Sequence, residues 1–131
     1  MKLHHVAVVC SSEENADRFY GEILGLRKIK TSTLNKDLAE RLFGVASEPQ
    51  MILYENEDFA IEVFVTPLDP GKFTPFTHLC LAVEDRGEFL GRCQKAGLAV
   101  QQIPKGDSLL GFVQDYDGNL LEIKALPSSS R

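Results

Sequence analysis

The chain has 131 residues, enough for one domain of ordinary size, and its 44% apolar and 25% charged residues are typical of globular proteins. The 14 basic and 19 acidic residues give a formal net charge of −5, which argues against binding to nucleic acid or to an anionic membrane. No apolar run approaches the roughly 20 residues that span a bilayer, and three cysteines without CxxC spacing fit free thiols in a reducing compartment, so we expect a cytoplasmic protein.

The first half of the chain, residues 1–66, is predicted to alternate strands and helices. A Val-rich strand over 3–10 precedes a helix over 13–24, in which apolar residues recur at i, i+3 and i+4. Ser12 is expected to cap the start of this helix and Gly25 to end it. The elements that follow are a strand over 26–33, a short helix over 35–43, and a hairpin of strands 51–54 and 59–66.

The second half repeats this order after a Pro/Gly-rich linker over 67–75. Its predicted elements are a strand over 77–83, a helix over 85–96, a strand over 99–103, and a hairpin that turns at 115–119. We therefore predict an α+β fold of two tandem βαβββ modules. They form one domain over 1–126, made of modules 1–66 and 74–126; a tail over 127–131 follows, in which residues 128–131 are expected to be disordered.

An alignment without gaps supports the repeat. Residues 51–63 align with 111–123, so that Ile52 meets Phe112 and Glu62 meets Glu122. His5 and His78 occupy equivalent places in the two predicted first strands. One histidine and one glutamate thus recur at matched points of both modules.

The two glutamates are predicted to lie in strands that are buried on both faces, because their neighbours on either side are apolar. An unpaired buried carboxylate is costly, and a divalent metal ion would remove that cost. Two imidazoles and two carboxylates suit Zn, Ni, Co, Mn or Fe. The alternative is that each of these residues is an ordinary strand residue with a hydrogen-bond partner. His4 is expected to be a surface histidine.

The chain resembles the vicinal oxygen chelate superfamily, which comprises glyoxalase I, bleomycin-resistance proteins and extradiol dioxygenases. The resemblance covers about residues 3–125 and rests on His5, the FYxxxLGL element at 19–26, Ile61-Glu62, Thr77-His78 and the DxDGNxxE element at 115–122. It implies paired βαβββ modules whose curved mixed sheets enclose a metal cleft. It also implies one divalent metal ion per site, held by His5, Glu62, His78 and Glu122.

A His–Glu–His–Glu set is similar to that of glyoxalase I (lactoylglutathione lyase), a metal-dependent lyase or isomerase. The resemblance implies that Glu122 takes a proton from the carbon beside a carbonyl, with Glu62 as its catalytic counterpart, and that the metal stabilises the enediolate. The substrate would be a small carbonyl compound or its thiol adduct. Two alternatives remain: another enzyme of the superfamily, such as an acyl-CoA epimerase or a dioxygenase, and a non-catalytic binding or resistance protein.

Strand parity places further residues on the same faces as the presumed ligands. Val9, Phe64 and Thr66 share the face of His5 and Glu62, while Cys80 and Lys124 share that of His78 and Glu122. We expect these five to contact substrate, with Cys80 as a small packing residue rather than a nucleophile. Relatives that bind glutathione tend to have Arg and Asn where this chain has Val9 and Thr66, so the glutathione anchors are missing.

The resemblance finally implies a homodimer. Each metal site would lie either within one chain or between two chains, with the His5–Glu62 pair from one protomer and the His78–Glu122 pair from its partner.

Overall fold

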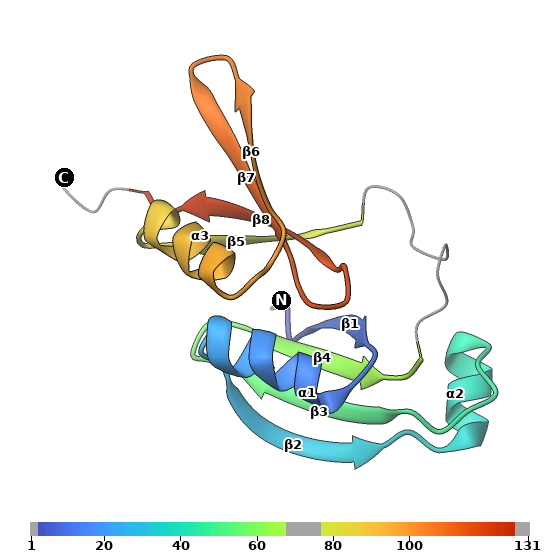
Figure 1. The fold of residues 1–131 in the computed structure, drawn as a ribbon. Helices are drawn as coiled ribbons and strands as arrows, with labels where there is room; N and C mark the ends of the chain where they lie inside the picture. Colours follow the sequence, from blue (N-terminus) through green and yellow to red (C-terminus); the bar gives the residue numbers. More distant parts are fainter. Residues whose placement is uncertain (1–2, 68–76, 128–131) are drawn as a thin grey trace. The chain divides into compact units, whose positions relative to one another are not determined.

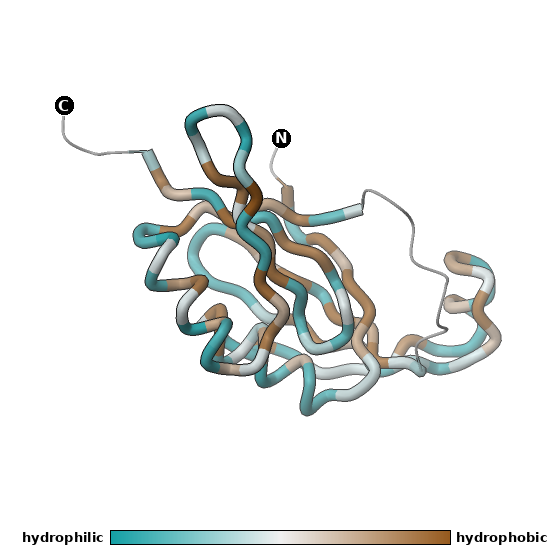
Figure 2. Tube along the Cα trace, turned by 45° about the horizontal axis from the view of Figure 1, so that its top comes forward, coloured by the Kyte–Doolittle hydropathy of each residue, from teal (hydrophilic) through white to brown (hydrophobic). Residues whose placement is uncertain are grey.

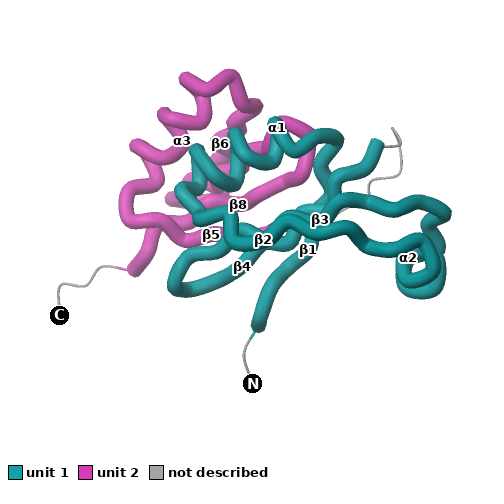
Figure 3. The backbone as a smooth tube through the Cα atoms, turned by 90° about the horizontal axis from the view of Figure 1, so that it is seen from below, with its two compact units in different colours: residues 1–70 teal, residues 71–131 magenta. Residues whose placement is uncertain are grey.

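The computed structural model describes residues 3–67 and 77–127. The chain divides into two compact units, Met1–Pro70 and Gly71–Arg131, which Figure 3 draws in different colours. The boundary falls within the predicted linker. Most of that linker, like the end of the predicted tail, lies outside the described residues.

The first unit is a four-stranded mixed sheet with two helical segments. Its elements are β1 (Val6–Cys10), α1 (Glu13–Ala16), η1 (Asp17–Ile23), β2 (Arg27–Thr33), α2 (Lys36–Phe43), β3 (Gln50–Glu55) and β4 (Ala60–Val65). The strand order is β1-β4-β3-β2; β1 runs parallel to β4, and the other pairs are antiparallel. Helix α1 and its continuation η1 cross one face of this sheet (Figure 1).

The second unit repeats the topology without a counterpart of α2. Its elements are β5 (Leu79–Val83), α3 (Arg86–Lys95), β6 (Val100–Lys105), β7 (Ser108–Gln114) and β8 (Leu120–Ala125). The order is β5-β8-β7-β6, again with one parallel pair, β5 and β8. The predicted α+β fold with two βαβββ modules is therefore confirmed.

The helix predicted over 13–24 has an unexpected internal change. The Ser12 hydroxyl accepts a hydrogen bond from the Asn15 amide, as expected of a cap, but the α-helix ends at Ala16 and continues as a π-helix. The Leu24 amide accordingly donates to the Phe19 carbonyl, five residues back, at 2.9 Å. The π-helical segment has only 7 residues, too few for their apolar spacing to distinguish the two helix types, so the sequence does not reveal the change.

The two histidines lie just outside the strands in which they were predicted. β1 begins at Val6 and β5 at Leu79, so His5 and His78 each precede a first strand by one residue. The physical reason is the pairing: Val6 is opposite Ile61, and Leu79 is opposite Leu121. The paired residues of both ladders therefore begin one position after each histidine.

The alignment of the two hairpins without gaps is wrong by one residue on its first strand. Leu53 is opposite Glu62 in the first unit, whereas Phe112 is opposite Glu122 in the second. The turn over 56–59 has four residues and the turn over 115–119 has five. Leu53 therefore corresponds to Phe112 rather than to Val113.

Each sheet buries one face beneath its helix. In the first unit Phe19 and Tyr20 are fully buried, and the Tyr54 hydroxyl donates to Asp17 Oδ1 at 2.7 Å, which ties strand β3 to the helix. In the second unit Phe89 and Leu90 of α3 are buried, as are the inward residues of β7 and β8. Burial of such an apolar side chain contributes about 1.5–3 kcal/mol. Within the described residues, no helix is long and apolar enough to cross a membrane.

Hydropathy follows this arrangement. Figure 2 shows hydrophobic segments along the strands of both units, whereas the tip of the β6–β7 hairpin is hydrophilic. The opposite face of each sheet, away from α1 and η1 in the first unit and from α3 in the second, contains the residues of interest; α2 borders part of this face in the first unit.

The turn before β8 is organised by one buried carboxylate. Asp115 is 5% exposed, and its Oδ1 accepts hydrogen bonds from the amides of Asp117 and Asn119, both at 2.8 Å. Its Oδ2 accepts a third from the Asn119 side chain at 2.7 Å. Asn56 has the same role in the first unit, accepting from two amides of its turn. These turns set the register of the strands that contain Glu62 and Glu122.

Replacing Asp115 by Ala is expected to lower the free energy of unfolding by about 2 kcal/mol, because two backbone amides lose their acceptor. The matched control is Glu57→Ala, which removes an exposed carboxylate from the corresponding turn and is expected to change stability by less than about 0.5 kcal/mol. Chemical denaturation followed by circular dichroism measures both changes. Equal stability of the two variants would contradict the role of Asp115.

Candidate metal centre and adjoining pocket

The first unit brings together one histidine and one glutamate from its two parallel strands. His5 Nε2 lies 3.6 Å from Glu62 Oε1, and the side chains are 37% and 25% exposed. Because β1 pairs in parallel with β4, Ala7 is opposite Glu62. His5 is two residues before Ala7, so its side chain lies on the same face of the sheet as Glu62. Two residues that are 57 positions apart in the sequence thus form a pair.

The second unit contains the same arrangement. His78 Nε2 lies 3.6 Å from Glu122 Oε1, with exposures of 40% and 16%. Here Cys80 is opposite Glu122 on the parallel partner strand, as Ala7 is opposite Glu62. The prediction that the glutamates lie in strands buried on both faces is wrong: their apolar neighbours are buried against a helix, but the carboxylates lie on the open face.

The chemistry of each pair fits half of a metal site. Two ligands that lie about 2.1 Å from one ion are about 3.0–3.4 Å apart, depending on the geometry. The 3.6 Å between imidazole nitrogen and carboxylate oxygen is close to that spacing, and it is too long for a good hydrogen bond. Across residues 3–67 and 77–127, no three His, Cys, Asp or Glu side chains form a group that could hold a metal ion.

His4 has a contact that sequence parity did not predict. It is exposed, as expected, but its Nδ1 lies 2.9 Å from His5 Nδ1. One of these nitrogens must carry the proton and the other must accept it. When His5 is the donor, its Nε2 has a free lone pair on the side of Glu62, which is the tautomer that a metal ligand needs.

Val9, Phe64 and Thr66, three of the predicted substrate contacts, meet in one apolar pocket of the first unit. The pocket has a volume of about 230 Å³. From the two parallel strands and the residue after β4 it is lined by Ala7, Val8, Val9, Phe64 and Thr66. Its other side, from α2 and the segment that follows, consists of Ala39, Phe43, Val45 and Pro49.

The contribution of α2 to this pocket was not predicted. The Asn35 side chain caps the helix by accepting from the Leu38 amide, and Gly44, at φ +67°, ends it in a left-handed turn. The Leu34 amide donates to the Pro49 carbonyl, which closes the base of this excursion. Phe43, the last residue of the helix, is thereby held with its ring centroid 5.4 Å from that of Phe64.

The two other predicted substrate contacts lie in the second unit. Both are exposed: Cys80 lies on β5, opposite Glu122, and Lys124 lies on β8, two residues after Glu122. Partial removal of water and the charge of Glu122 raise the pKa of the Cys80 thiol, while Lys124 opposes the shift. Cys80 is therefore protonated at neutral pH, which argues against a nucleophile, whereas its exposure does not support the predicted packing role.

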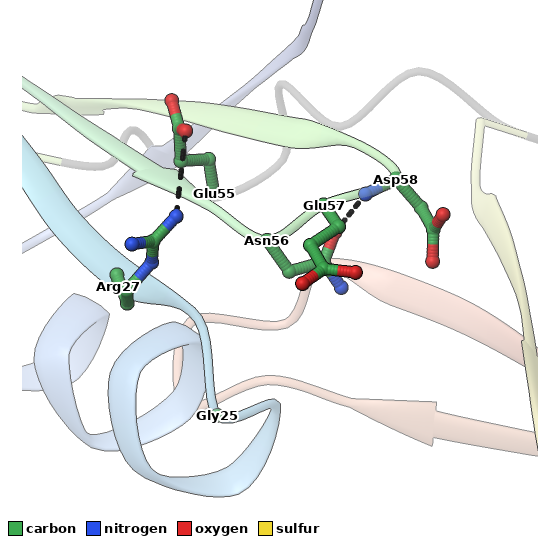
Figure 4. Close-up of a pocket in the computed structure, with 6 residues that line it drawn as sticks. All are labelled: Gly25, Arg27, Glu55, Asn56, Glu57 and Asp58. Carbon is green, nitrogen blue, oxygen red and sulfur yellow. Dashed lines mark hydrogen bonds and ion pairs between the residues drawn. The ribbon is translucent and has the colours of Figure 1, made fainter.

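A second hollow lies at the β3–β4 turn and is polar. It is lined by Gly25, Arg27 and the residues over 55–58, and Figure 4 shows Arg27 directed at Glu55, at a distance of 3.9 Å. The Asn56 side chain is engaged by the turn itself. The groups of this hollow are accounted for by the turn, so we assign no ligand to it.

Comparison with known proteins gives one family. The sequence model of the Glyoxalase/Bleomycin resistance protein/Dioxygenase superfamily matches residues 2–123. No curated protein sequence matches the chain.

Three solved structures illustrate the likeness of fold. The trypanothione-dependent glyoxalase I of Leishmania major is 15% identical, with a TM-score of 0.72 over 95% of this chain and 86% of that one. A glyoxalase family protein of Enterococcus faecalis is 20% identical, with a TM-score of 0.71 over 93% and 95%. A Glu-to-Gln mutant of the fosfomycin resistance protein FosX of Listeria monocytogenes, in complex with Mn(II) and 1S,2S-dihydroxypropylphosphonic acid, is 16% identical, with a TM-score of 0.70 over 95% and 92%. At such identities these likenesses concern the fold alone.

Proposed function

Because the chain belongs to the glyoxalase/bleomycin resistance protein/dioxygenase superfamily, we propose that it is a metal-dependent lyase or isomerase of the glyoxalase I type. Its substrate is a small carbonyl compound or the thiol adduct of one. The observation that supports this most is the duplicated pair: in each unit a histidine Nε2 and a glutamate Oε1 lie 3.6 Å apart at the same point of the same topology.

The proposed site combines the two pairs, so that His5, Glu62, His78 and Glu122 hold one divalent ion. When bound, a divalent ion supplies Lewis-acid stabilisation of the negative charge that proton removal leaves on the substrate. Glu122 takes the proton from the carbon beside the carbonyl and returns it to the adjacent carbon, and Glu62 is its counterpart. His5 and His78 supply the two nitrogen ligands, each with its Nε2 3.6 Å from a glutamate oxygen.

The sheet provides the environment for this proton transfer. Glu122 lies between Cys80 on one neighbouring strand and Phe112 on the other, and its side chain is only 16% exposed. Partial exclusion of water strengthens charge interactions at the carboxylate and limits unwanted proton exchange. Glu62 has a similar position between Ala7 and Leu53.

Metal binding tests the site directly. Elemental analysis is expected to find about one divalent ion per complete set of four ligands. His5→Ala and Glu122→Gln should each weaken the affinity for the ion more than about 100-fold, since loss of outer partners alone costs 10–100-fold. The control Glu55→Gln removes a carboxylate paired with Arg27, outside the proposed site, and should retain the metal.

Full occupancy in single variants of all four ligands would show that the site is wrongly assigned. A protein that purifies without stoichiometric metal would instead fit a non-catalytic binding protein.

Steady-state kinetics separate the catalytic base from the substrate contacts. Methylglyoxal with a series of thiols, and then acyl-CoA epimers, are the substrates to screen. Glu122→Ala is expected to lower kcat by about 10²–10⁴-fold, whereas Val9→Ala should mainly change KM. Equally small effects at both positions would mean that this site does not perform the reaction. Activity without oxygen distinguishes an isomerase from a dioxygenase.

We propose a homodimer in which each site takes His5 and Glu62 from one protomer and His78 and Glu122 from its partner. Twofold dimers are the commonest closed assemblies. Sedimentation should give twice the monomer mass of 14.6 kDa.

Mixing inactive His5→Ala with inactive His78→Ala is then decisive. A heterodimer with shared sites contains one site with both histidines and one with neither, so activity returns. If subunit exchange is demonstrated by mass spectrometry and no activity appears, the sites lie within single chains.

A further inference from the structure

The apolar pocket of the first unit adjoins the His5–Glu62 pair. In the parallel register Ala7 is opposite Glu62 and Val9 is opposite Phe64. Three of these four residues line the pocket, and the fourth is the glutamate of the proposed site. The pocket therefore lies directly beside Glu62, on the same face of the sheet. A molecule with its reacting carbon near Glu62 can extend a substituent into it.

The side chains that line the pocket disfavour a charged group of a ligand. None of the lining side chains is ionisable, and the Thr66 hydroxyl is the one polar group among them. The Thr66 amide is already used, because it donates to the Cys10 carbonyl at 3.0 Å. A carboxylate placed here would lose hydration without gaining a charged partner, which is strongly unfavourable.

The shape of the pocket suits an aromatic or branched group. Phe43 and Phe64 meet edge to face, with an angle of 68° between the ring planes. Phe43 is 58% exposed although it lines the pocket, so a ligand would remove much apolar ring surface from water. An engineered apolar cavity of about 150 Å³ accepts benzene, and the present volume is about 230 Å³.

We propose that this pocket binds an uncharged aromatic or branched alkyl substituent of the substrate. This inference rests on the proposed function for the identity of the reacting part, but not for the pocket itself. The substrate class is then an apolar carbonyl compound, or its adduct with an uncharged thiol, and not an adduct whose anionic end occupies this position.

Two probes of one shape and different charge test the pocket. Benzyl alcohol and benzoate are titrated into the full chain in EDTA, and amide chemical shifts are followed by NMR. Benzyl alcohol is expected to shift resonances of the pocket residues with an affinity in the millimolar range, and benzoate to bind at least about ten-fold more weakly. Tighter binding of benzoate, or of glutathione, at these residues would overturn the proposal.

Matched variants on α2 locate the binding. Phe43→Ala should weaken benzyl alcohol binding about ten-fold. Leu42→Ala removes a neighbouring exposed side chain that does not line the pocket, and should leave the affinity unchanged. Equal effects of the two variants would contradict the assignment.

Val9→Arg provides a second test that does not depend on Phe43. Val9 is 37% exposed, so a longer side chain can be accommodated. The variant should lose affinity for benzyl alcohol and gain affinity for benzoate, and failure to reverse this preference would also contradict the assignment. Because these titrations use no metal, they are independent of the proposed reaction. A chain that binds benzyl alcohol but never a metal ion would refute the proposed function alone, whereas one that binds metal but rejects benzyl alcohol would refute only this inference.

Discussion

Parallel pairing of the first and last strands of each unit is the constraint on which the site depends. β1 pairs with β4, and β5 with β8, and in both cases the register leaves a histidine just before one strand beside a glutamate within the other. A hairpin connection cannot make such a pair, because parallel strands require a crossover. The helix and the two intervening strands of each unit supply that crossover. The chemistry of the site is thus a consequence of the βαβββ order.

The crossover also gives the two faces of each sheet different roles. The helix lies on one face and buries the inward residues, among them Tyr20 and Ile61 in the first unit and Leu121 in the second. On the other face of the same strands, the side chains of Glu62 and Glu122 remain partly exposed. A carboxylate at Glu62 or Glu122 is therefore held by a rigid, well-packed strand while it remains available to a ligand.

The two units share a topology, but different residues surround the histidine–glutamate pair in each. The first contains α2, which its own caps and the Leu34–Pro49 hydrogen bond hold beside β4, and this excursion creates the apolar pocket. The second contains Cys80 and Lys124 near its glutamate instead. It also has Gly111 in β7, where a Cβ atom would lie 3.1 Å from the Leu90 side chain, so α3 packs close to the sheet. One unit thus offers an apolar surface and the other a polar one.

The sequence alone determined the order of the elements, the duplication, and the recurrence of one histidine and one glutamate at matched points of both modules, because apolar periodicity and repeated motifs are local properties. Other features required the tertiary structure. The correspondence between the two hairpins differs by one residue from the alignment without gaps, because the turn of the second hairpin is one residue longer. Apolar residues match in either alignment, so the sequence does not show where the extra residue lies. The accessibility of the sheet face that contains the glutamates and the contact of Phe43 with Phe64 depend on the packing of elements that are distant in the sequence. Such contacts are fixed by how elements pack, which residue type and spacing do not encode.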